Sequence, residues 1–248
     1  MITKPKNGPS SAKVKAKSAS KTTLKRMTAD EAATRHRAFR DQVMAAGLAH
    51  VPFDGWSRKA FVNGAKDLGQ GTEAVRRAFP GGLRDAADHF ADWSDRRMLD
   101  ALAKLDLDAM RVRDRVMMGV KVRLELNTVH REAIRRLLSF LALPIHARLA
   151  VRMTWRTCDH IWHAAGDRAA DFNHYTKRAL LAPVYTSTIL YWLADTSDGF
   201  EDTWGYLDRR ITDVLKIPMY KAKAQQVIGR LPSPLDVLRR LRKVARPV

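Results

Sequence analysis

The chain has 248 residues, of which 46% are hydrophobic and 29% charged, so it can bury a core and a fully disordered chain is excluded. Most of its formal net charge of +19 lies at the ends, because residues 1–26 carry eight Lys or Arg without an acidic residue and residues 216–248 carry nine against one Asp. Because the body of the chain is nearly neutral, its positive charge does not indicate a uniformly basic DNA-binding face. The single cysteine, Cys158, excludes an internal disulfide.

The N-terminal residues 1–27 are expected to form a disordered basic tail. Their large apolar residues are isolated, so the segment lacks the hydrophobic stretch of a secretory signal. A first helix is predicted from Thr28, which forms a capping box with Glu31, and Pro52 and Gly55 mark its end.

Two short helices follow, the first from about Trp56 to the sequence LGQG and the second over residues 72–79, ahead of FPGG. With the long helix after them, they resemble the helix-turn-helix region of tetracycline-repressor-type transcription regulators, which assigns residues 28–82 to such a subdomain. Only Arg76 and Arg77 provide positive charge on the short second helix, so DNA binding is not expected. A DNA-binding regulator remains the alternative function.

Residues 83–217 carry apolar side chains at helical spacing, and no stretch of the sequence alternates as a strand would. The chain is therefore predicted to be all-α, with about ten helices. Pro144 separates two helices of this region, and Asp171 is a candidate cap for a later one. That later helix contains the longest uncharged run, the sixteen residues Ala179–Ala194. Because a membrane span needs about 20 apolar residues, no transmembrane helix is expected.

Residues 218–248 are expected to form a linker and a basic amphipathic helix that lies on an anionic membrane surface. Leucines form one side of this helix and basic residues cover the rest: Leu235, Leu238 and Leu241 against Arg239, Arg240, Arg242 and Lys243. The same leucine spacing also suits a terminal helix that docks on the body or on a dimer partner, and this alternative stays open.

A cluster of possible metal ligands lies between residues 158 and 174, formed by Cys158, Asp159, His160, His163, Asp167, Asp171 and His174. Cys158 and His160 are about 200° apart on a helix and cannot converge on one ion, so surface histidines and helix caps are the preferred interpretation. The sequence contains no nucleophile elbow, Walker loop or dinucleotide fingerprint. We therefore expect neither a metal site nor an enzyme.

A longer run, beginning at Asp159, contains a specific pattern of residues in addition to its helical periodicity. The sequence DHIWHAAGDRAADFNHYTKRALLAPVYTSTILYWLADTSDGFEDTWGYLDRRI resembles the signature of the coenzyme Q biosynthesis accessory family, that of the ninth Coq protein of mitochondria and its α-proteobacterial relatives. The matching elements are Trp162, Gly166-Asp167, Asp171, Tyr175-Thr176-Lys177-Arg178, Leu181, Tyr185, Thr188, Asp195, Ser197, Asp202-Thr203-Trp204, Leu207 and Arg210. With a looser match from Met44 through Leu83, the resemblance covers most of residues 28–217.

The resemblance implies a repressor-like fold in which the helix-turn-helix is an inherited scaffold. It also implies a non-enzymatic, usually dimeric protein without a cofactor, which holds an isoprenoid quinone or phospholipid in a hydrophobic pocket. Such a protein would serve the demethoxyubiquinone hydroxylase or another quinone-ring hydroxylase. It would bind the membrane through its C-terminal helix, on the cytoplasmic side of the inner membrane in a bacterium or the matrix side in a mitochondrion.

A lipid cavity is expected among the helices of residues 83–217, because a quinone tail left in water costs about 0.8 kcal/mol per methylene. Its candidate lining residues are Leu137, Leu141, Trp155, Leu181, Tyr185, Ile189 and Leu193, although each could equally be an ordinary core residue. The resemblance further predicts a partner-binding patch near the mouth of the pocket, formed by Tyr191, Trp192, Asp195, Asp202 and Trp204. Trp204 could equally be a core anchor.

Overall fold

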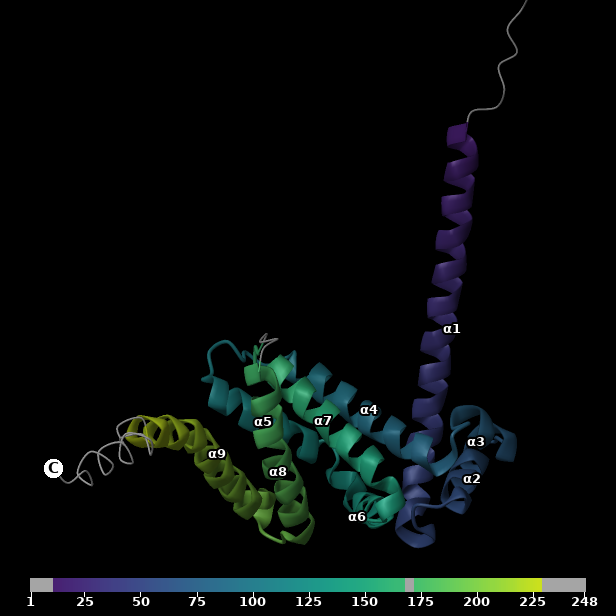
Figure 1. Ribbon diagram of the computed structural model, residues 1–248. Helices are drawn as coiled ribbons and strands as arrows, with labels where there is room; N and C mark the ends of the chain where they lie inside the picture. The colour runs from purple at the N-terminus through teal and green to yellow at the C-terminus, as the bar shows by residue number, and fades with distance from the viewer. Residues whose placement is uncertain (1–10, 168–171, 229–248) are drawn as a thin grey trace, which may run out of the picture. The chain divides into compact units, whose positions relative to one another are not determined.

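The computed structural model describes the backbone of residues 11–167 and 172–228 and the side chains of Thr28, residues 30–167 and residues 175–214 (Figure 1). Over these residues the protein has nine α-helices and three short 3-10 helices, and it contains no strand. The all-α prediction is confirmed. The helical elements are α1 (Ser11–Asp54), α2 (Arg58–Asp67), α3 (Thr72–Ala78), α4 (Gly82–Leu102), α5 (Val112–Glu125), η1 (Thr128–His130), α6 (Arg131–Leu141), η2 (Pro144–His146), α7 (Ala147–Ala164), α8 (Phe172–Ala194), η3 (Asp198–Phe200) and α9 (Glu201–Ile228).

The chain forms two compact units. Unit 1 contains residues up to Trp93 and residues His130–Leu149, and unit 2 contains residues Ser94–Val129 and the residues from Ala150 on. Helix α6 thus belongs to unit 1, where it packs on α1, whereas the sequence had assigned it to a domain of residues 83–217. Its apolar face of Ala133, Ile134 and Leu137 is buried there, and its place in the sequence does not tell on which helix that face packs.

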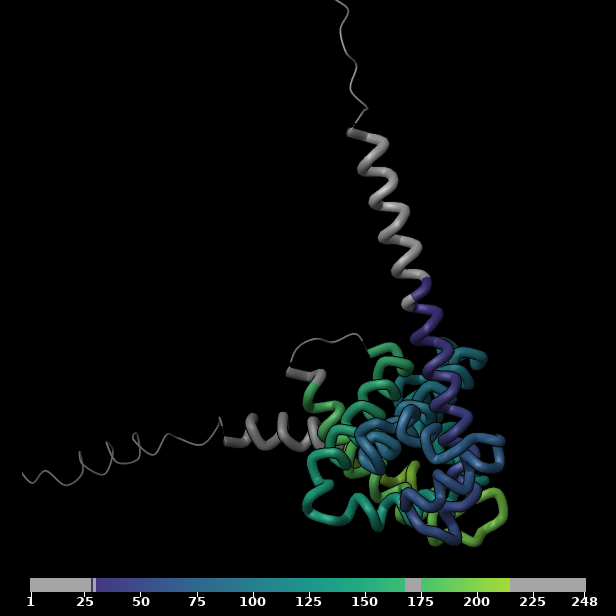
Figure 2. The backbone as a smooth tube through the Cα atoms, turned by 90° about the vertical axis from the view of Figure 1, so that its right-hand side faces the viewer, coloured from purple at the N-terminus to yellow at the C-terminus, as the bar shows by residue number. Residues whose placement is uncertain are grey.

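The core of unit 1 forms where the C-terminal half of α1 lies against α2 and α3 (Figure 2). Val43, Met44 and Leu48 of α1 are at most 1% exposed, as is Phe61 of α2. The Phe61 ring meets the Trp56 ring edge-to-face at 5.2 Å, a geometry that aromatic pairs prefer. Burial of these side chains holds the helix-turn-helix, α2 and α3, against α1.

The backbones of α1 and α2 approach each other very closely at two glycines. A Cβ atom added at Gly64 would lie 2.4 Å from the backbone nitrogen of Gly47 and 2.5 Å from the carbonyl carbon of Ala46. A Cβ added at Gly47 would lie 2.3 Å from the Phe61 ring. Because real Cβ atoms do not come within 3.0 Å of other heavy atoms, these two positions require glycine for packing.

Unit 2 is built around α5, α8 and α9, which pack on one another. Its largest fully buried side chains include Trp192 of α8, Leu207 of α9 and Ile161 of α7. Gly119 of α5 lies beneath Ile161, where an added Cβ would meet that side chain at 2.9 Å. Val116, Val120 and Leu124, spaced four residues apart on α5, are also buried and form the apolar face of that helix.

Two helix boundaries differ from the sequence prediction. Helix α1 begins at Ser11, not at Thr28, so the backbone of residues 11–27 is helical where a disordered tail was expected. This segment has neither Pro nor Gly and is rich in Ala and Lys, which favour a helix. Helix α9 continues to Ile228, beyond residue 218, where a linker was expected. The predicted cap Asp171 lies outside the described residues.

No single helix of the described part of the chain is long and apolar enough to cross a membrane. Only the bent pair Thr128–Leu141 and Pro144–Ala164, taken together, reaches the necessary length and composition.

The close approach of α1 and α2 gives a test of the packing in unit 1. Gly64→Ala should lower the free energy of unfolding by about 1–3 kcal/mol, because one of the two backbones must move to admit the methyl group. The matched control is Gly205→Ala in α9, where an added Cβ meets only the flexible end of Arg209 at 3.4 Å. That variant should be neutral or more stable by up to about 1 kcal/mol, since Ala has the higher helix propensity. Urea denaturation of both variants measures the difference, and equal stabilities would contradict the observed packing.

Candidate functional site

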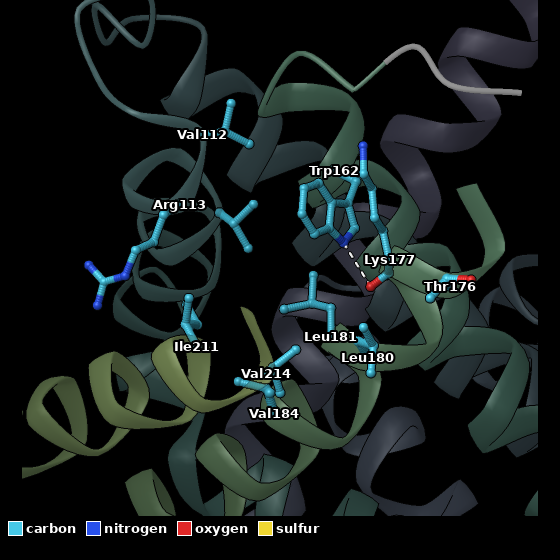
Figure 3. Close-up of a pocket in the computed structure, with 11 residues that line it drawn as sticks. Val112, Arg113, Trp162, Thr176, Lys177, Leu180, Leu181, Val184, Ile211 and Val214 are labelled. Atoms are coloured by element: carbon cyan, nitrogen blue, oxygen red, sulfur yellow. Dashed lines mark hydrogen bonds between the residues drawn. The ribbon is translucent and has the colours of Figure 1, made fainter. Parts of the chain in front are cut away.

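An apolar cavity of about 230 Å³ lies in unit 2, among α5, α8, α9 and the end of α7 (Figure 3). Aliphatic side chains from three helices provide most of its surface. The residues that line it are Val112, Arg113, Val116, Trp162, Thr176, Lys177, Leu180, Leu181, Val184, Ile211 and Val214. On α8 these residues recur at i, i+4 and i+7, so one face of a single helix forms a large part of the wall.

The two cationic residues at the cavity are both bound by carboxylates. The Arg113 guanidinium points away from the cavity in Figure 3 and donates through Nη2 to Asp208 Oδ1 at 2.6 Å and to Thr212 Oγ1 at 2.8 Å. Lys177 Nζ donates to Asp167 Oδ1 at 2.7 Å. These ion pairs leave an apolar interior, and the Arg113 contacts join α5 to α9, which contributes Ile211 to the cavity.

Trp162 closes the end of the cavity beside the start of α8. Its indole Nε1 donates to the backbone carbonyl of Lys177 at 3.1 Å, and the Lys177 ammonium lies 5.3 Å from the ring centroid. The neighbouring Arg178 is only 2% exposed and donates to Asp159 at 2.6 Å and to Asp167 at 3.0 Å. These bonds fix the end of α7 to α8 next to the cavity, and the indole presents an apolar ring to it.

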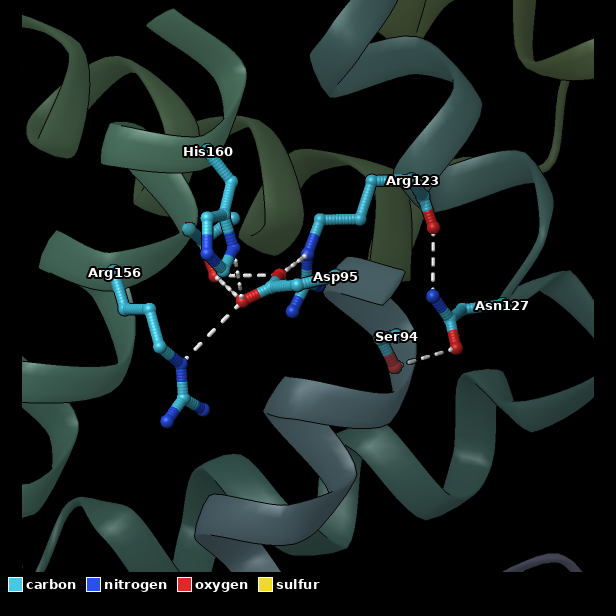
Figure 4. Close-up of polar contacts among 7 residues, drawn as sticks. Ser94, Asp95, Arg123, Asn127, Arg156 and His160 are labelled. Atoms are coloured by element: carbon cyan, nitrogen blue, oxygen red, sulfur yellow. Dashed lines mark hydrogen bonds and ion pairs between the residues drawn. The ribbon is translucent and has the colours of Figure 1, made fainter. Parts of the chain in front are cut away.

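A buried polar network joins α4, α5 and α7 in the same unit (Figure 4). Asp95 is fully buried and accepts hydrogen bonds from Arg123 Nε at 2.8 Å and from Thr157 Oγ1 at 2.9 Å. Arg156 and His160 also approach its Oδ2 atom, at 3.6 Å and 3.4 Å. Burial alone would raise the pKa of Asp95, but the charge of Arg123 and the surrounding donors outweigh burial and lower the pKa. Asp95 is therefore a structural carboxylate in its charged form.

The two other titratable groups near this network are held neutral. Burial raises the pKa of the Cys158 thiol to about 12, and it also raises the pKa of Tyr185, whose ring lies 5.5 Å from the Arg123 guanidinium carbon. A buried thiol that stays protonated is a poor nucleophile. No group of three or more His, Cys, Asp or Glu side chains among the described residues could hold a metal ion.

Of the seven residues predicted to line a lipid cavity, the structure places Leu181 on this one. Tyr185, Ile189 and Leu193 follow it on α8 and are buried, but they do not line the cavity. Trp155 of α7 is half-buried beside Tyr175, and Leu137 and Leu141 belong to α6 in unit 1.

The sequence analysis did not single out the aliphatic lining residues Val112, Val116, Leu180, Val184, Ile211 and Val214. The only feature of the sequence that could have indicated them is their helical spacing, which predicts the buried face of a helix. Which faces meet around a cavity depends on how the helices cross, and the spacing does not contain that information.

The five residues predicted to bind a partner do not all reach the surface. Trp192 is fully buried beside Phe200, so the structure places it in the core and not on the surface patch. The Asp195 carboxylate is only 6% exposed and accepts hydrogen bonds from the backbone N–H groups of Ser197 at 2.7 Å and Thr203 at 2.9 Å. Its role is to order the turn into α9 and the first turn of that helix.

Tyr191, Asp202 and Trp204 do lie at the surface of unit 2. Tyr191 is 39% exposed and stacks on Tyr206 with the ring centroids 4.6 Å apart. The Trp204 indole donates to the carbonyl of Gly199 at 2.8 Å, and the Lys121 ammonium lies 5.2 Å from its ring centroid. The aromatic surface of α8 and α9 is thus held in a fixed arrangement. The predicted membrane-binding residues, 235–243, lie outside the described part of the chain.

Comparison with known proteins identifies relatives of one kind. Residues 147–218 match the COQ9 family model. The chain is 33% identical over 183 residues to the ubiquinone biosynthesis protein COQ9, mitochondrial, of Rattus norvegicus, which covers 71% of this chain and 58% of the rat protein. It is 32% identical over 183 residues to the protein of that name from Homo sapiens, with 71% and 57% coverage. The chain therefore spans less than two thirds of the length of these relatives.

A solved structure supports the fold assignment. The TetR transcriptional regulator from Nitrosomonas europaea ATCC 19718 superimposes with a TM-score of 0.58 over 71% of this chain and 97% of the regulator. The sequence identity is 20%, so the match concerns the fold alone. The predicted tetracycline-repressor-like fold is confirmed.

The Asp195 hydrogen bonds predict a pH-dependent contribution to stability. Burial would raise the pKa of Asp195, but the bonds from Ser197 and Thr203 outweigh it and lower the pKa from 3.8 to about 2. A carboxylate with a lowered pKa stabilises the fold fully above its unfolded-state pKa, and this stability is lost as the pH falls through the folded-state value.

Asp195→Asn should therefore reduce the free energy of unfolding by about 1–3 kcal/mol at neutral pH. The gap between the parent and the variant should stay constant above about pH 5 and shrink to about half by pH 3. Urea titrations at several pH values measure the gap. A gap that does not change with pH would show that the charge of Asp195 makes no contribution.

Proposed function

The chain belongs to the COQ9 family, and from this membership we propose that it serves ubiquinone biosynthesis as a lipid-binding accessory protein rather than as a catalyst. It holds an isoprenoid quinone intermediate, or a phospholipid, at the membrane surface and presents the quinone to a ring hydroxylase such as the demethoxyubiquinone hydroxylase. The observation that carries the proposal is the apolar cavity between α5, α8 and α9.

The chemistry of the cavity suits a hydrocarbon rather than a polar metabolite. Val116, Leu181 and Val184 form its deep part, and each is only 3% exposed. Each methylene that moves from water into such a space contributes about 0.8 kcal/mol. Because Arg113 and Lys177 are bound to carboxylates, neither draws an anionic head inward.

The size of the cavity limits what enters it. A volume of about 230 Å³ is below the about 300–1,000 Å³ that encloses a whole drug-sized ligand. A quinone ring or the first part of a prenyl tail therefore enters, and the remainder of the lipid stays outside. This partial enclosure suits a protein that presents a lipid to another enzyme.

The surface of Tyr191, Asp202 and Trp204 is where we place the hydroxylase. Large aromatic side chains that are partly exposed and held by neighbours lose little conformational entropy when a partner covers them. Tyr191 is stacked on Tyr206 and Trp204 is bonded to Gly199, so both already have a fixed orientation. The patch belongs to α8 and α9, two of the helices that enclose the cavity.

The titratable groups of unit 2 support a role without catalysis. Asp95 and Arg123 are paired with each other in the core, and the Cys158 thiol is kept protonated. None of these three residues lines the cavity, and the two cationic residues that do, Arg113 and Lys177, are each paired with a carboxylate.

The alternative function, regulation of transcription, is supported less well by α3. Arg76 is paired with Glu73, and the Arg77 guanidinium lies 4.6 Å from the centroid of the Phe39 ring. A DNA-reading helix keeps such cations available for phosphates and base edges. The similarity to a TetR regulator concerns the fold alone, and one fold carries many functions.

A cavity-filling variant tests the proposed lipid binding. Val184→Phe should place its ring in the cavity, so the purified protein should carry several-fold less quinone or phospholipid while its stability is kept. Organic extraction followed by mass spectrometry measures the bound lipid. The control is Val122→Phe, which adds the same ring at a half-buried position of α5 that does not line the cavity. Equal lipid content in the parent, the variant and the control would contradict the proposal, and so would a parent protein without any lipid.

The predicted C-terminal helix has a separate test in the full chain. Leu238→Glu with Leu241→Glu should strongly reduce binding to vesicles that contain phosphatidylglycerol, because the change places charge on the inserted face. High salt should weaken the binding of the parent protein without abolishing it, since screening acts on the headgroup attraction only. Vesicle co-sedimentation measures both effects. Loss of a dimer in the variant without loss of vesicle binding would assign the helix to self-association.

A further inference from the structure

The chain turns between α6 and α7 (Figure 1), and this corner is apolar and exposed. We define the corner as residues 141–147, with the sequence LALPIHA. Leu143 is 52% exposed and Ile145 is 67% exposed, and Ala142, Pro144 and Ala147 are exposed beside them. Single exposed leucines are ordinary on protein surfaces, but a contiguous group of apolar residues at a corner indicates a contact surface.

The corner is held in one conformation from within unit 1. Arg84 of α4 donates through Nε to His146 Nδ1 at 3.2 Å and through Nη2 to the carbonyl of Ile145. His146 is 6% exposed, and its ring stacks on the Phe140 ring with the centroids 4.0 Å apart. The backbone N–H of His146 donates to the Leu143 carbonyl at 2.8 Å. Because the backbone is already ordered, Leu143 and Ile145 can enter a binding partner without the entropy cost of ordering a loop.

The charge around the corner is mostly positive. From Ala133 to Leu149 the chain contains three arginines and no acidic residue. These arginines, Arg135, Arg136 and Arg148, are exposed, and so is Arg84, which binds the corner. The only nearby acid of α6 is Glu132, which lies 3.1 Å from Arg135 and 3.2 Å from Arg136. The surroundings of the two aliphatic side chains therefore carry excess positive charge.

This combination of charge and apolar surface distinguishes between the possible occupants. A second copy of the chain, related by a two-fold axis, would bring the same arginines against each other, and Glu132 is the single carboxylate of α6 that could pair with them. A nucleic acid would satisfy the arginines, but its phosphates would leave Leu143 and Ile145 in water. An anionic bilayer offers headgroups for the arginines and acyl chains for the aliphatic residues.

We propose that residues 141–147 form a membrane-inserting corner, in which Leu143 and Ile145 enter the interface of an anionic bilayer and Arg84, Arg135, Arg136 and Arg148 bind its headgroups. The corner is a contact additional to the C-terminal helix. The inference goes beyond the proposed function, because it requires neither the cavity in unit 2 nor the residues after 228.

The test uses full-length proteins and sucrose-loaded vesicles of phosphatidylcholine, with or without phosphatidylglycerol. Leu143→Glu with Ile145→Glu should lower the partition coefficient onto anionic vesicles by about tenfold or more, since both insertion and headgroup attraction are reduced. The corner substitutions should lower the partition coefficient by a similar factor when they are added to the variant Leu238→Glu with Leu241→Glu. The reason is that the two membrane contacts belong to different segments. This factorial design separates a failure of the corner from a failure of the C-terminal helix.

The matched control is Phe53→Glu with Leu68→Glu, which adds the same charge at two exposed apolar residues of unit 1. The control should bind vesicles within about twofold of the parent protein, because it lies outside the inserted surface. A corner variant that binds like this control overturns the proposal. A corner variant that changes the oligomeric mass in light scattering, with vesicle binding unchanged, also overturns it in favour of a contact between copies.

A second variant guards against a loss of binding that is caused by unfolding. Arg135→Gln with Arg136→Gln and Arg148→Gln changes only exposed residues, and circular dichroism should report a melting temperature near that of the parent. Its binding to anionic vesicles should fall and should depend less on salt than the binding of the parent. An unchanged salt dependence would contradict the role assigned to these arginines.

Discussion

The buried pair of Asp95 and Arg123 is the constraint on which unit 2 depends. A charge in a protein core costs several kcal/mol of desolvation, and the cost is offset only when its hydrogen-bonding atoms have partners. Here Asp95 of α4 receives bonds from Arg123 of α5 and Thr157 of α7, while the Arg123 guanidinium lies over the Tyr185 ring of α8. The pair thus fixes four helices relative to one another, and loss of one partner would cost about 3–5 kcal/mol.

The apolar cavity exists because polar groups hold the surrounding helices while their own charges stay outside it. The contact of Arg113 with Asp208 places α9 on α5, and the bonds of Arg178 and Lys177 to Asp167 place the start of α8 on the end of α7. Aliphatic side chains form the rest of the cavity wall and leave the space between the helices open. The result is a partly open apolar pocket whose shape is set by ion pairs at its edges.

The helix-turn-helix of unit 1 shows how a fold can keep its geometry while its surface chemistry changes. Close packing at Gly47 and Gly64 and the burial of Phe61 hold α2 and α3 against α1 in a repressor-like arrangement. On α3, however, Arg76 pairs with Glu73 and Arg77 lies over Phe39. The fold is thus determined by buried residues, whereas the function is determined by the exposed ones, and the two can diverge.

The sequence by itself determined the all-α class, the extents of α2 and α3 and the break at Pro144, because caps, prolines and the 3.6-residue period are local properties. It also provided the family through the run that begins at Asp159. Tertiary structure alone decided that Leu181 lies on the cavity while Leu137 lies in unit 1, and that Trp192 is core. A buried leucine that lines a cavity and one that fills a core have the same local pattern. Only the crossing of distant helices distinguishes them.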